Sequence, residues 1–167
     1  MMTSVSEDQR SMFSCRQVTA QDFEMISTFP RSEQELFFIS PKLRFPLTAG
    51  QLEEIAKERR CPTVLTCARH VSGYANFYNV EKDKCWLGNF IISPEYRGKG
   101  AAEFLIKHMM GQAGEELKVQ ELHLICHNIN TRALLFYTRM GFKPYEISNR
   151  TTHQGSTIAG IHMRITV

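Results

Sequence analysis

The chain has 167 residues, of which 43% are apolar and 22% are charged, and its formal net charge is +3. These values are typical of one soluble globular domain that is long enough to bury its own core. The charge is small and evenly scattered, which argues against a basic nucleic-acid-binding module, and no apolar run approaches the ~18 residues of a membrane span.

The first third of the chain alternates short apolar stretches with prolines. A strand is expected over residues 13–18, followed by three short helices. Each helix starts near a Thr or Ser that has Asp, Glu or Gln three residues later, which is the spacing of a capping box. The three pairs are Thr19 with Asp22, Ser32 with Glu35, and Thr48 with Gln51.

After Pro62 the pattern changes to strands, interrupted by a glycine-containing loop with its helix and by a second helix that Gly141 closes. The chain contains no repeat, low-complexity tract or linker. We therefore expect residues 1–11 to be disordered and residues 12–167 to form a single domain. The expected strands cover residues 63–69, 74–80, 86–93, 121–127, 143–148 and 158–167.

The glycine-containing loop has the properties of a phosphate site. Its glycines let the backbone approach a ligand closely, and the first N–H groups of the following helix have no partner within the helix. The helix dipole and two cations add positive charge at the same place. The spacing fits neither a Walker loop nor the Rossmann fingerprint, whose third glycine would fall on Glu103. The loop consists of Arg97, Gly98, Lys99, Gly100, Ala101 and Ala102.

These six residues do fit the Q/R-x-x-G-x-G/A loop of the GCN5-related N-acetyltransferase (GNAT) family, and residues 130–142 resemble that family's N-x-x-A-x-x-x-Y-x-x-x-G-F segment. The similarity is firm over about residues 70–145. It implies the α/β fold of acyl-CoA N-acyltransferases. In that fold a mixed, mostly antiparallel sheet of six or seven strands is splayed at its centre, between the strands at 86–93 and 121–127, and helices cover both faces.

The resemblance also implies the activity, an acetyl-CoA-dependent N-acetyltransferase that moves an acetyl group to a primary amine by direct attack. Arg97 to Ala102 would bind the diphosphate of acetyl-CoA. The backbone of three strand residues would hydrogen-bond its pantetheine arm, and one of their N–H groups would polarise the thioester carbonyl. These three residues are Phe90, Ile91 and Ile92.

The second motif would complete the site. Asn130, Ala133 and Tyr137 lie within about 60° of one another on a helix, so they can face one ligand. The resemblance implies that Asn130 touches the CoA arm and that Tyr137 donates a proton to the departing sulfur. Structural roles stay open beside these: Tyr137 as a core aromatic, Asn130 as a helix cap, Lys99 as a solvated charge, and residues 90–92 as plain core strand.

The general base is not determined by the sequence. In the family branch that acetylates ribosomal-protein N-termini, a Glu commonly lies five residues before the motif Asn, and this chain has Ile125 there. Asn89 could orient a water, and Glu33 or Glu35 could attract an ammonium group. No metal is expected, because His123 and His127 are separated by about 13 Å of strand and are interpreted as sheet-surface residues.

In this family the region of the first two helices and the loop before the last strand set acceptor identity, here residues 29–48 and 148–157. Their mixture of aromatic and charged side chains slightly favours a small amine or an amino-acid-like acceptor over a protein lysine. A non-catalytic acyl-CoA-binding sensor or scaffold is the alternative function.

The expected partners are acetyl-CoA and an amine acceptor, without nucleic acid or membrane, and a homodimer is left open. Five scattered cysteines without a C-x-x-C pair indicate reduced thiols, and the N-terminal residues lack the apolar core of a signal peptide. We therefore expect a cytoplasmic protein.

Overall fold

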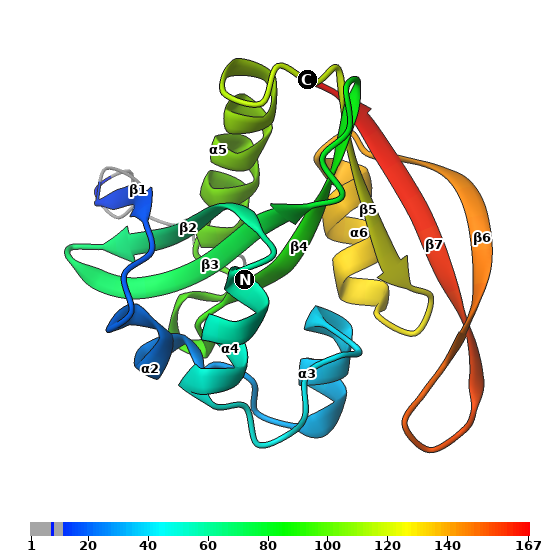
Figure 1. The fold of residues 1–167 in the computed structure, drawn as a ribbon, viewed down its shortest axis with the longest axis horizontal. Helices are drawn as coiled ribbons and strands as arrows, with labels where there is room; N and C mark the ends of the chain where they lie inside the picture. Colours follow the sequence, from blue (N-terminus) through cyan, green and yellow to red (C-terminus); the bar gives the residue numbers. More distant parts are fainter. Residues whose placement is uncertain (1–7, 9–11) are drawn as a thin grey trace.

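Seven strands form one sheet in the order β1-β2-β3-β4-β5-β7-β6 (Figure 1). The computed structural model describes residue 8 and residues 12–167, so the disorder predicted for residues 1–7 and 9–11 lies outside the described residues. All neighbouring strands are antiparallel except β4 and β5, which are parallel, as the expected mixed sheet requires. The strands are β1 (Phe13–Gln17), β2 (Arg60–Cys67), β3 (His70–Tyr78), β4 (Lys84–Ile92), β5 (Glu121–His127), β6 (Lys143–Thr151) and β7 (Thr157–Thr166).

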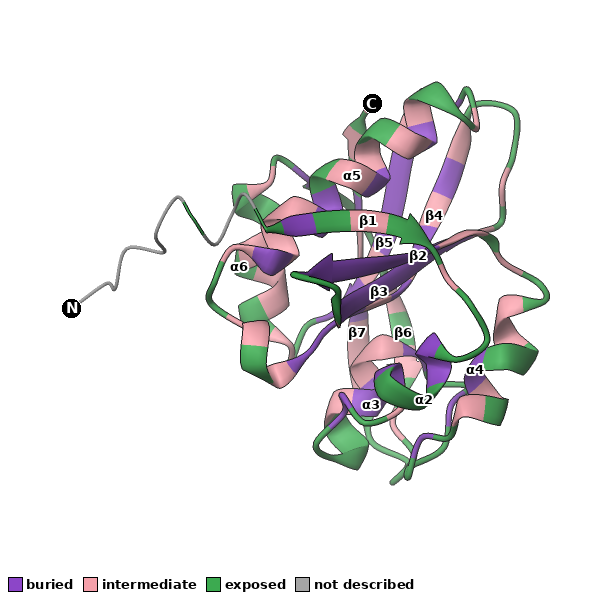
Figure 2. Cartoon of the chain, turned by 90° about the vertical axis from the view of Figure 1, so that its left-hand side faces the viewer, coloured by how far each residue is buried: buried purple, intermediate pink, exposed green. Residues whose placement is uncertain are grey.

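Helices cover both faces of this sheet, as predicted. In Figure 2 helix α5 lies on one side of β1, β2 and β3, and α2, α3 and α4 lie on the other side. The helices are α2 (Asp22–Ile26), α3 (Glu33–Ile39), α4 (Ala49–Ala56), the 3-10 helix η1 (Pro94–Tyr96), α5 (Ala101–Glu115) and α6 (Thr131–Arg139).

All three predicted Thr or Ser pairs interact, and in two of them the hydroxyl of the first residue caps the helix. The Ser32 hydroxyl accepts a hydrogen bond from the Glu35 N–H, and the Thr48 hydroxyl accepts one from the Gln51 N–H. Such caps satisfy N–H groups that a helix leaves without partners, and each contributes ~1 kcal/mol.

The third pair forms the other half of a capping box. The Asp22 carboxylate accepts hydrogen bonds from the Thr19 N–H at 2.7 Å and the Thr19 hydroxyl at 2.9 Å, although helix α2 itself has Gln21 as its N-cap. The same carboxylate accepts two bonds from the Arg16 guanidinium at 2.7 and 2.8 Å. These bonds hold the pKa of Asp22 at about 2, with the Arg16 bonds as the largest cause.

Strand β2 also starts earlier than predicted, at Arg60 rather than after Pro62. Its pairing with β3 shifts register between Arg60 and Thr63, so an irregularity accommodates the proline, which has no N–H to donate. A sequence pattern that treats proline as a strand boundary misses such a continuation.

The sheet separates two apolar cores. On one face α5 buries five side chains against the strands, and on the other α2, α3 and α4 close a smaller core over β2, β3 and β4. Burial of each large apolar side chain contributes ~1.5–3 kcal/mol. The α5 residues are Ala101, Leu105, Ile106, Met109 and Ala113.

The predicted opening lies between β4 and β5. Their parallel ladder pairs residues 84–86 with residues 121–123 and then stops, although both strands continue. Strand β5 stays paired with β7 to its end, so only the side toward β4 is free. The carboxyl halves of β4 and β5 therefore border a gap in the middle of the sheet.

None of the helices in the described part of the chain combines the length and apolar character needed to cross a membrane. Among the described residues, no group of three or more His, Cys, Asp or Glu side chains could hold a metal ion. The five cysteines are free thiols, and burial raises the pKa of Cys15, Cys85 and Cys126 to about 12.

Candidate active site

The predicted cofactor loop connects η1 to the start of α5. Gly98 and Gly100 adopt φ values of +73° and +85°, the left-handed region that glycine enters at little cost. Gly100 is the N-cap of α5 and supplies no side-chain cap, so the loop leaves the helix N-terminus open to a ligand. A Cβ at Gly98 would meet nothing within 4 Å. This open, positively polarised backbone fits a diphosphate group.

The two cations of this loop differ in their surroundings. Lys99 is exposed, with its Nζ 5.9 Å from the centre of the Tyr96 ring. The Arg97 guanidinium donates to both carboxylate oxygens of Glu35 in α3, at 2.8 and 3.3 Å, and its Nε donates to the Ile92 carbonyl at 3.1 Å. The side chain predicted to neutralise a phosphate thus already has an anionic partner.

Glu35 is held as an anion by this arrangement. Burial opposes its charge, but hydrogen bonds from Arg97 and from the Arg31 N–H outweigh burial and keep the pKa of Glu35 below its usual value. The ion pair ties α3 to the loop before α5, two segments that are far apart in the sequence.

Strand β4 contains a bulge where the resemblance places the thioester. Tyr74 of β3 pairs with Ile91, but Asn76 pairs with Gly88, so β4 carries one extra residue between these pairs. Asn89 lies in this bulge with φ of +49°, and its Oδ1 accepts a bond from Asn76 Nδ2 at 2.9 Å. A bulge interrupts the ladder and frees backbone groups, and bulges are common beside active sites.

The three strand residues predicted to hold the pantetheine arm surround this bulge. Ile91 and Ile92 are buried, and Phe90 is half-buried with its ring centre 6.2 Å from those of Phe136 and Tyr137. The side chains of Ile91 and Ile92 therefore pack in the core, and any contact of these two residues with a cofactor would come from their backbone.

Helix α6 carries the second motif. Asn130 is its N-cap and accepts a hydrogen bond from the Ala133 N–H at 3.3 Å, so the capping role weighed for Asn130 is realised. Ala133 is half-buried against the larger core. The capping role of Asn130 and the packing of Ala133 are both compatible with contact to a CoA arm.

Tyr137 lines a cavity of the protein. Its ring packs against Phe90, Phe136 and Phe142, with centres 5.3–6.2 Å apart. Among the described residues, none forms a hydrogen bond with the Tyr137 hydroxyl. Burial, with a smaller effect of the Cys126 thiol, raises the pKa of this phenol, which is therefore protonated at neutral pH.

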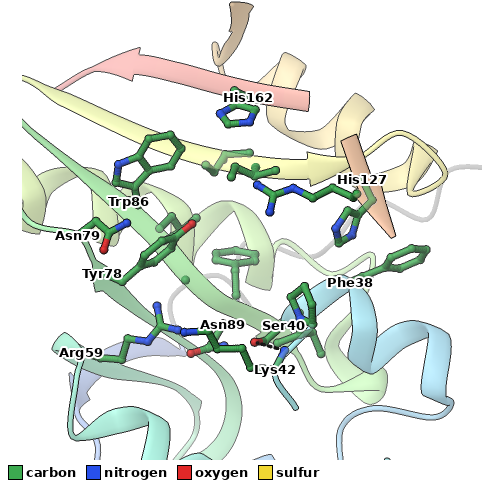
Figure 3. Close-up of a pocket in the computed structure, with 18 of the residues that line it drawn as sticks. Phe38, Ser40, Lys42, Arg59, Tyr78, Asn79, Trp86, Asn89, His127 and His162 are labelled. Carbon is green, nitrogen blue, oxygen red and sulfur yellow. Dashed lines mark hydrogen bonds between the residues drawn. The ribbon is translucent and has the colours of Figure 1, made fainter. Parts of the chain in front are cut away.

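The cavity has a volume of about 610 Å³ and reaches the gap between β4 and β5. Figure 3 shows it bordered by Phe38, Ser40 and Lys42 from the end of α3, with side chains of the sheet around it. Asn89, Phe90 and Tyr137 line it, whereas the other predicted site residues do not. The predicted phosphate loop therefore lies outside the cavity that Tyr137 lines.

The acceptor segments proposed from the sequence meet beside this cavity. His153, near the tip of the β6–β7 hairpin, accepts a hydrogen bond from Arg44 at 2.8 Å and lies edge-on to the ring of Phe37. Its ring is also 3.5 Å from the Glu33 carboxylate. Of the two acidic candidates for attracting the amine, neither Glu33 nor Glu35 lines the cavity.

Two arginines in the cavity were missed by the sequence analysis. The first is Arg59, which directly precedes β2, and the second is Arg150 of β6. Neither arginine forms an ion pair with a described residue. Gly88 and Gly160 lie beneath them, since a Cβ at Gly88 would come within 2.9 Å of Arg59 Nη1, and one at Gly160 within 2.9 Å of Arg150 Nε. A glycine inside a strand often marks a place where another group approaches the backbone closely, so Gly88 and Gly160 were the sequence signal for these two arginines.

His127 was also underestimated, because it is 6% exposed and lines the cavity instead of the sheet surface. Its ring stacks on Phe37 with centres 4.7 Å apart. Burial, assisted by the charge of Arg150, lowers the pKa of His127 below its ordinary 6.5, so it is neutral at pH 7. His123 is buried as well, and its ring bonds Tyr145 and Glu121, which gives it a structural role.

The chain is similar to known proteins both in sequence and in structure. Residues 28–142 match the model of the acetyltransferase (GNAT) family. A spermine/spermidine N(1)-acetyltransferase of Bacillus subtilis (strain 168) is 30% identical over 60 residues, which cover 36% of this chain and 40% of that relative. The match therefore spans less than half the length of the curated relative.

Solved structures extend the similarity to nearly the whole chain. The spermidine N-acetyltransferase of Vibrio cholerae in complex with CoA and spermine superposes with a TM-score of 0.78 at 19% identity, over 93% of this chain and 96% of that one. The ribosomal-protein-S18-alanine N-acetyltransferase of Escherichia coli gives 0.70 at 20% identity, over 93% and 94%. At these identities the likeness establishes the fold.

Proposed function

Because the chain belongs to the acetyltransferase (GNAT) family, we propose that it transfers an acetyl group from acetyl-CoA to the nitrogen of a primary amine. The observation that carries this proposal is the placement of Tyr137. This residue lines the cavity at the gap between β4 and β5, and its hydroxyl has no hydrogen-bond partner among the described residues.

The chain offers a place for each part of acetyl-CoA. The backbone of residues 98–102 would bind the diphosphate, with Lys99 beside it, and the Arg97–Glu35 ion pair would hold the loop in shape. The backbone of Phe90, Ile91 and Ile92 at the β4 bulge would hold the pantetheine arm, and Asn130 and Ala133 would contact it from α6. Bound acetyl-CoA supplies an activated acetyl thioester.

The reaction needs two proton transfers on opposite sides of the acetyl group. The amine nitrogen bonds to the acetyl carbon while the carbon–sulfur bond breaks, and Tyr137 gives its proton to the sulfur. The acceptor arrives as an ammonium ion and loses two protons in all. One goes to a base, and the second replaces the proton that Tyr137 donated. General acid and base catalysis of this kind contributes about 10²–10⁴-fold in rate.

We assign the base to His127. It lines the cavity, it is neutral at pH 7, and its ring has no hydrogen-bond partner among the described residues. Asn89, the other cavity residue considered from the sequence, already accepts a hydrogen bond from Asn76 and titrates at no accessible pH. A neutral imidazole can take a proton from an ammonium group near neutral pH.

The alternative, a non-catalytic acyl-CoA-binding sensor, shares the cofactor loop but requires neither Tyr137 nor His127. Turnover therefore separates the two functions. A cytoplasmic location and a homodimer belong to the proposal as well, and gel filtration with light scattering tests the dimer.

The cofactor assignment is tested by thermal unfolding with and without acetyl-CoA, in the wild type and in a Gly100→Trp variant that fills the loop. At about 100 times its Kd, acetyl-CoA should stabilise the wild type by ~2.7 kcal/mol, a rise of roughly 5–10 °C in Tm, and the variant much less. Amine-dependent release of free thiol then tests transfer. A wild type that acetyl-CoA does not stabilise would overturn the proposal.

A further inference from the structure

The cavity beside Tyr137 is lined by cationic side chains and by no Asp or Glu among the described residues. We propose that the acceptor is a small primary amine that carries an anionic group, a carboxylate or a phosphonate, and that Arg59 and Arg150 bind this group. The inference rests on the proposed acetyltransferase function. It excludes polyamines, which carry only positive charges, as preferred acceptors.

Arg59 is a partly buried cation that forms no ion pair with a described residue, although the charge of the neighbouring Glu58 acts on it. Its guanidinium carbon lies 4.7 Å from the centre of the Tyr78 ring, which fixes it against β3. Gly88 makes room for it on β4, because a Cβ there would come within 2.9 Å of Nη1. Figure 3 places Arg59 near Asn89 and Tyr78, on the side of the cavity formed by β3 and β4. An unpaired and partly buried charge is costly unless a ligand compensates it.

Arg150 reaches the same cavity from β6. It passes over Gly160 of β7 and approaches Ile125 of β5, since a Cβ at Gly160 would lie 2.9 Å from Arg150 Nε and 3.1 Å from an Ile125 methyl group. The Nε is buried and has no hydrogen-bond acceptor among the described residues. The charge of Arg150 acts on Tyr78, which the charge of Arg59 also reaches, so both cations lie around one phenol.

The charged groups that line the cavity are all of one sign. Lys42 joins the two arginines, His127 and His162 are the titratable rings, and no Asp or Glu is among the described lining residues. Glu146 lies near His162 but outside the lining. A polyamine would meet like charge here, whereas a carboxylate or phosphonate would accept charge-assisted hydrogen bonds from the guanidinium groups.

The anion site is separate from the phosphate-binding part of the cofactor site. None of residues 97–102 lines the cavity, so its arginines are not placed to bind the diphosphate. A volume of about 610 Å³ is in the range of small-molecule sites. Tyr137 and His127 line the same cavity. An acceptor whose anionic group is bound by the arginines would therefore have its amine in the cavity that also contains the two residues proposed to transfer protons.

The test compares acceptors that differ in one terminal group. Three matched pairs are γ-aminobutyrate with n-butylamine, β-alanine with n-propylamine, and phenylalanine with phenethylamine. Putrescine and spermidine represent polyamines, and aminopropylphosphonate separates a phosphonate preference from a carboxylate preference. For at least one pair we expect kcat/KM of the anionic member to exceed that of its neutral-tailed partner and of both polyamines roughly tenfold or more, the effect of one charge-assisted hydrogen bond.

Substitution of Arg59 and Arg150 tests whether these two residues cause the preference for anionic acceptors. Arg59→Gln and Arg150→Gln should each raise KM for the anionic acceptor roughly tenfold, with kcat and the KM of the neutral amine changed less than about threefold. Arg59→Lys should retain part of the wild-type KM. Arg69→Gln, an exposed arginine outside the cavity, is the charge-matched control and should change neither value. Melting temperatures of all variants monitor folding.

The outcomes distinguish this inference from the proposed function. If no anionic acceptor exceeds its partner, or if a polyamine is the best acceptor, the inference is overturned while the acetyltransferase stands. If acetyl-CoA does not bind, the proposed function fails, and calorimetric titration with the anionic amines still tests the anion site. Loss of their binding in both Gln variants supports it, and no binding to the wild type overturns it.

Discussion

Replacing Tyr137 by Phe removes one hydroxyl from the cavity and leaves the ring in place. The hydroxyl has no hydrogen-bond partner among the described residues, so its loss breaks no internal bond and creates no unsatisfied group. The free energy of unfolding should therefore change by less than about 0.5 kcal/mol. If Tyr137 protonates the sulfur, kcat should fall about 10²–10⁴-fold, with the Kd of acetyl-CoA unchanged.

Tyr145→Phe is a matched control with the opposite expectation. The Tyr145 hydroxyl lies 2.8 Å from His123 Nδ1, outside the cavity. Its removal should lower the free energy of unfolding by ~1 kcal/mol and leave kcat unchanged.

Urea unfolding and steady-state thiol release, measured on the same variants, decide whether Tyr137 is the proton donor. A Tyr137→Phe variant that keeps its kcat would refute the role of proton donor. A variant that loses stability and activity in proportion would instead make Tyr137 a core aromatic.

Three further perturbations follow from single contacts. Glu35→Gln weakens the anchor of Arg97 and should raise KM for acetyl-CoA roughly threefold, with faster hydrogen exchange in the loop; an unchanged KM would detach the ion pair from cofactor binding. Because the folded-state pKa of Asp22, about 2, lies below its ordinary 3.8, its stabilisation of about 2 kcal/mol is present above pH 3.8 and lost as the pH falls through about 2. Asp22→Asn should remove this pH dependence from urea-unfolding curves, and a persistent dependence would assign it to other carboxylates. His127→Gln should lower kcat roughly 100-fold and abolish an acidic limb that the wild type shows below pH 6.5; a limb that survives the substitution would exclude His127 as the base.

Local signals made part of this molecule predictable. The cofactor loop could be located from its sequence because glycines at fixed offsets before an amphipathic helix determine the backbone directly, and Gly98 and Gly100 do adopt left-handed conformations. The caps at Ser32 and Thr48 are likewise decided within four residues. At α2 the Thr19 N–H and the Asp22 carboxylate also bond within four residues, and the Arg16 guanidinium adds two bonds to the same carboxylate.

The cavity could not be predicted because its groups meet only in the folded chain. Arg59 precedes β2 and Arg150 lies in β6, far away in the sequence. Only the glycines that accommodate these arginines, Gly88 and Gly160, left a trace in the strand pattern. Alternation along β5 showed that His127 shares a face with His123. It could not show that Phe37 covers that face and buries the ring.

The partner of Arg97 was hidden for the same reason. The guanidinium was expected to face a phosphate, yet it pairs with Glu35, 62 residues away in the sequence. A pattern of charges along a chain does not reveal which opposite charge folding will bring beside it. Whether the loop binds a diphosphate through its backbone remains a prediction.

The central claim is that CoA binds with its diphosphate on the loop before α5 and its sulfur at Tyr137. A crystal structure of the protein with CoA tests this most directly. The account predicts diphosphate oxygens on the backbone N–H groups of residues 98–102 and the CoA sulfur within hydrogen-bond reach of the Tyr137 hydroxyl. A CoA molecule bound elsewhere, or one whose sulfur lies away from the gap between β4 and β5, would contradict it.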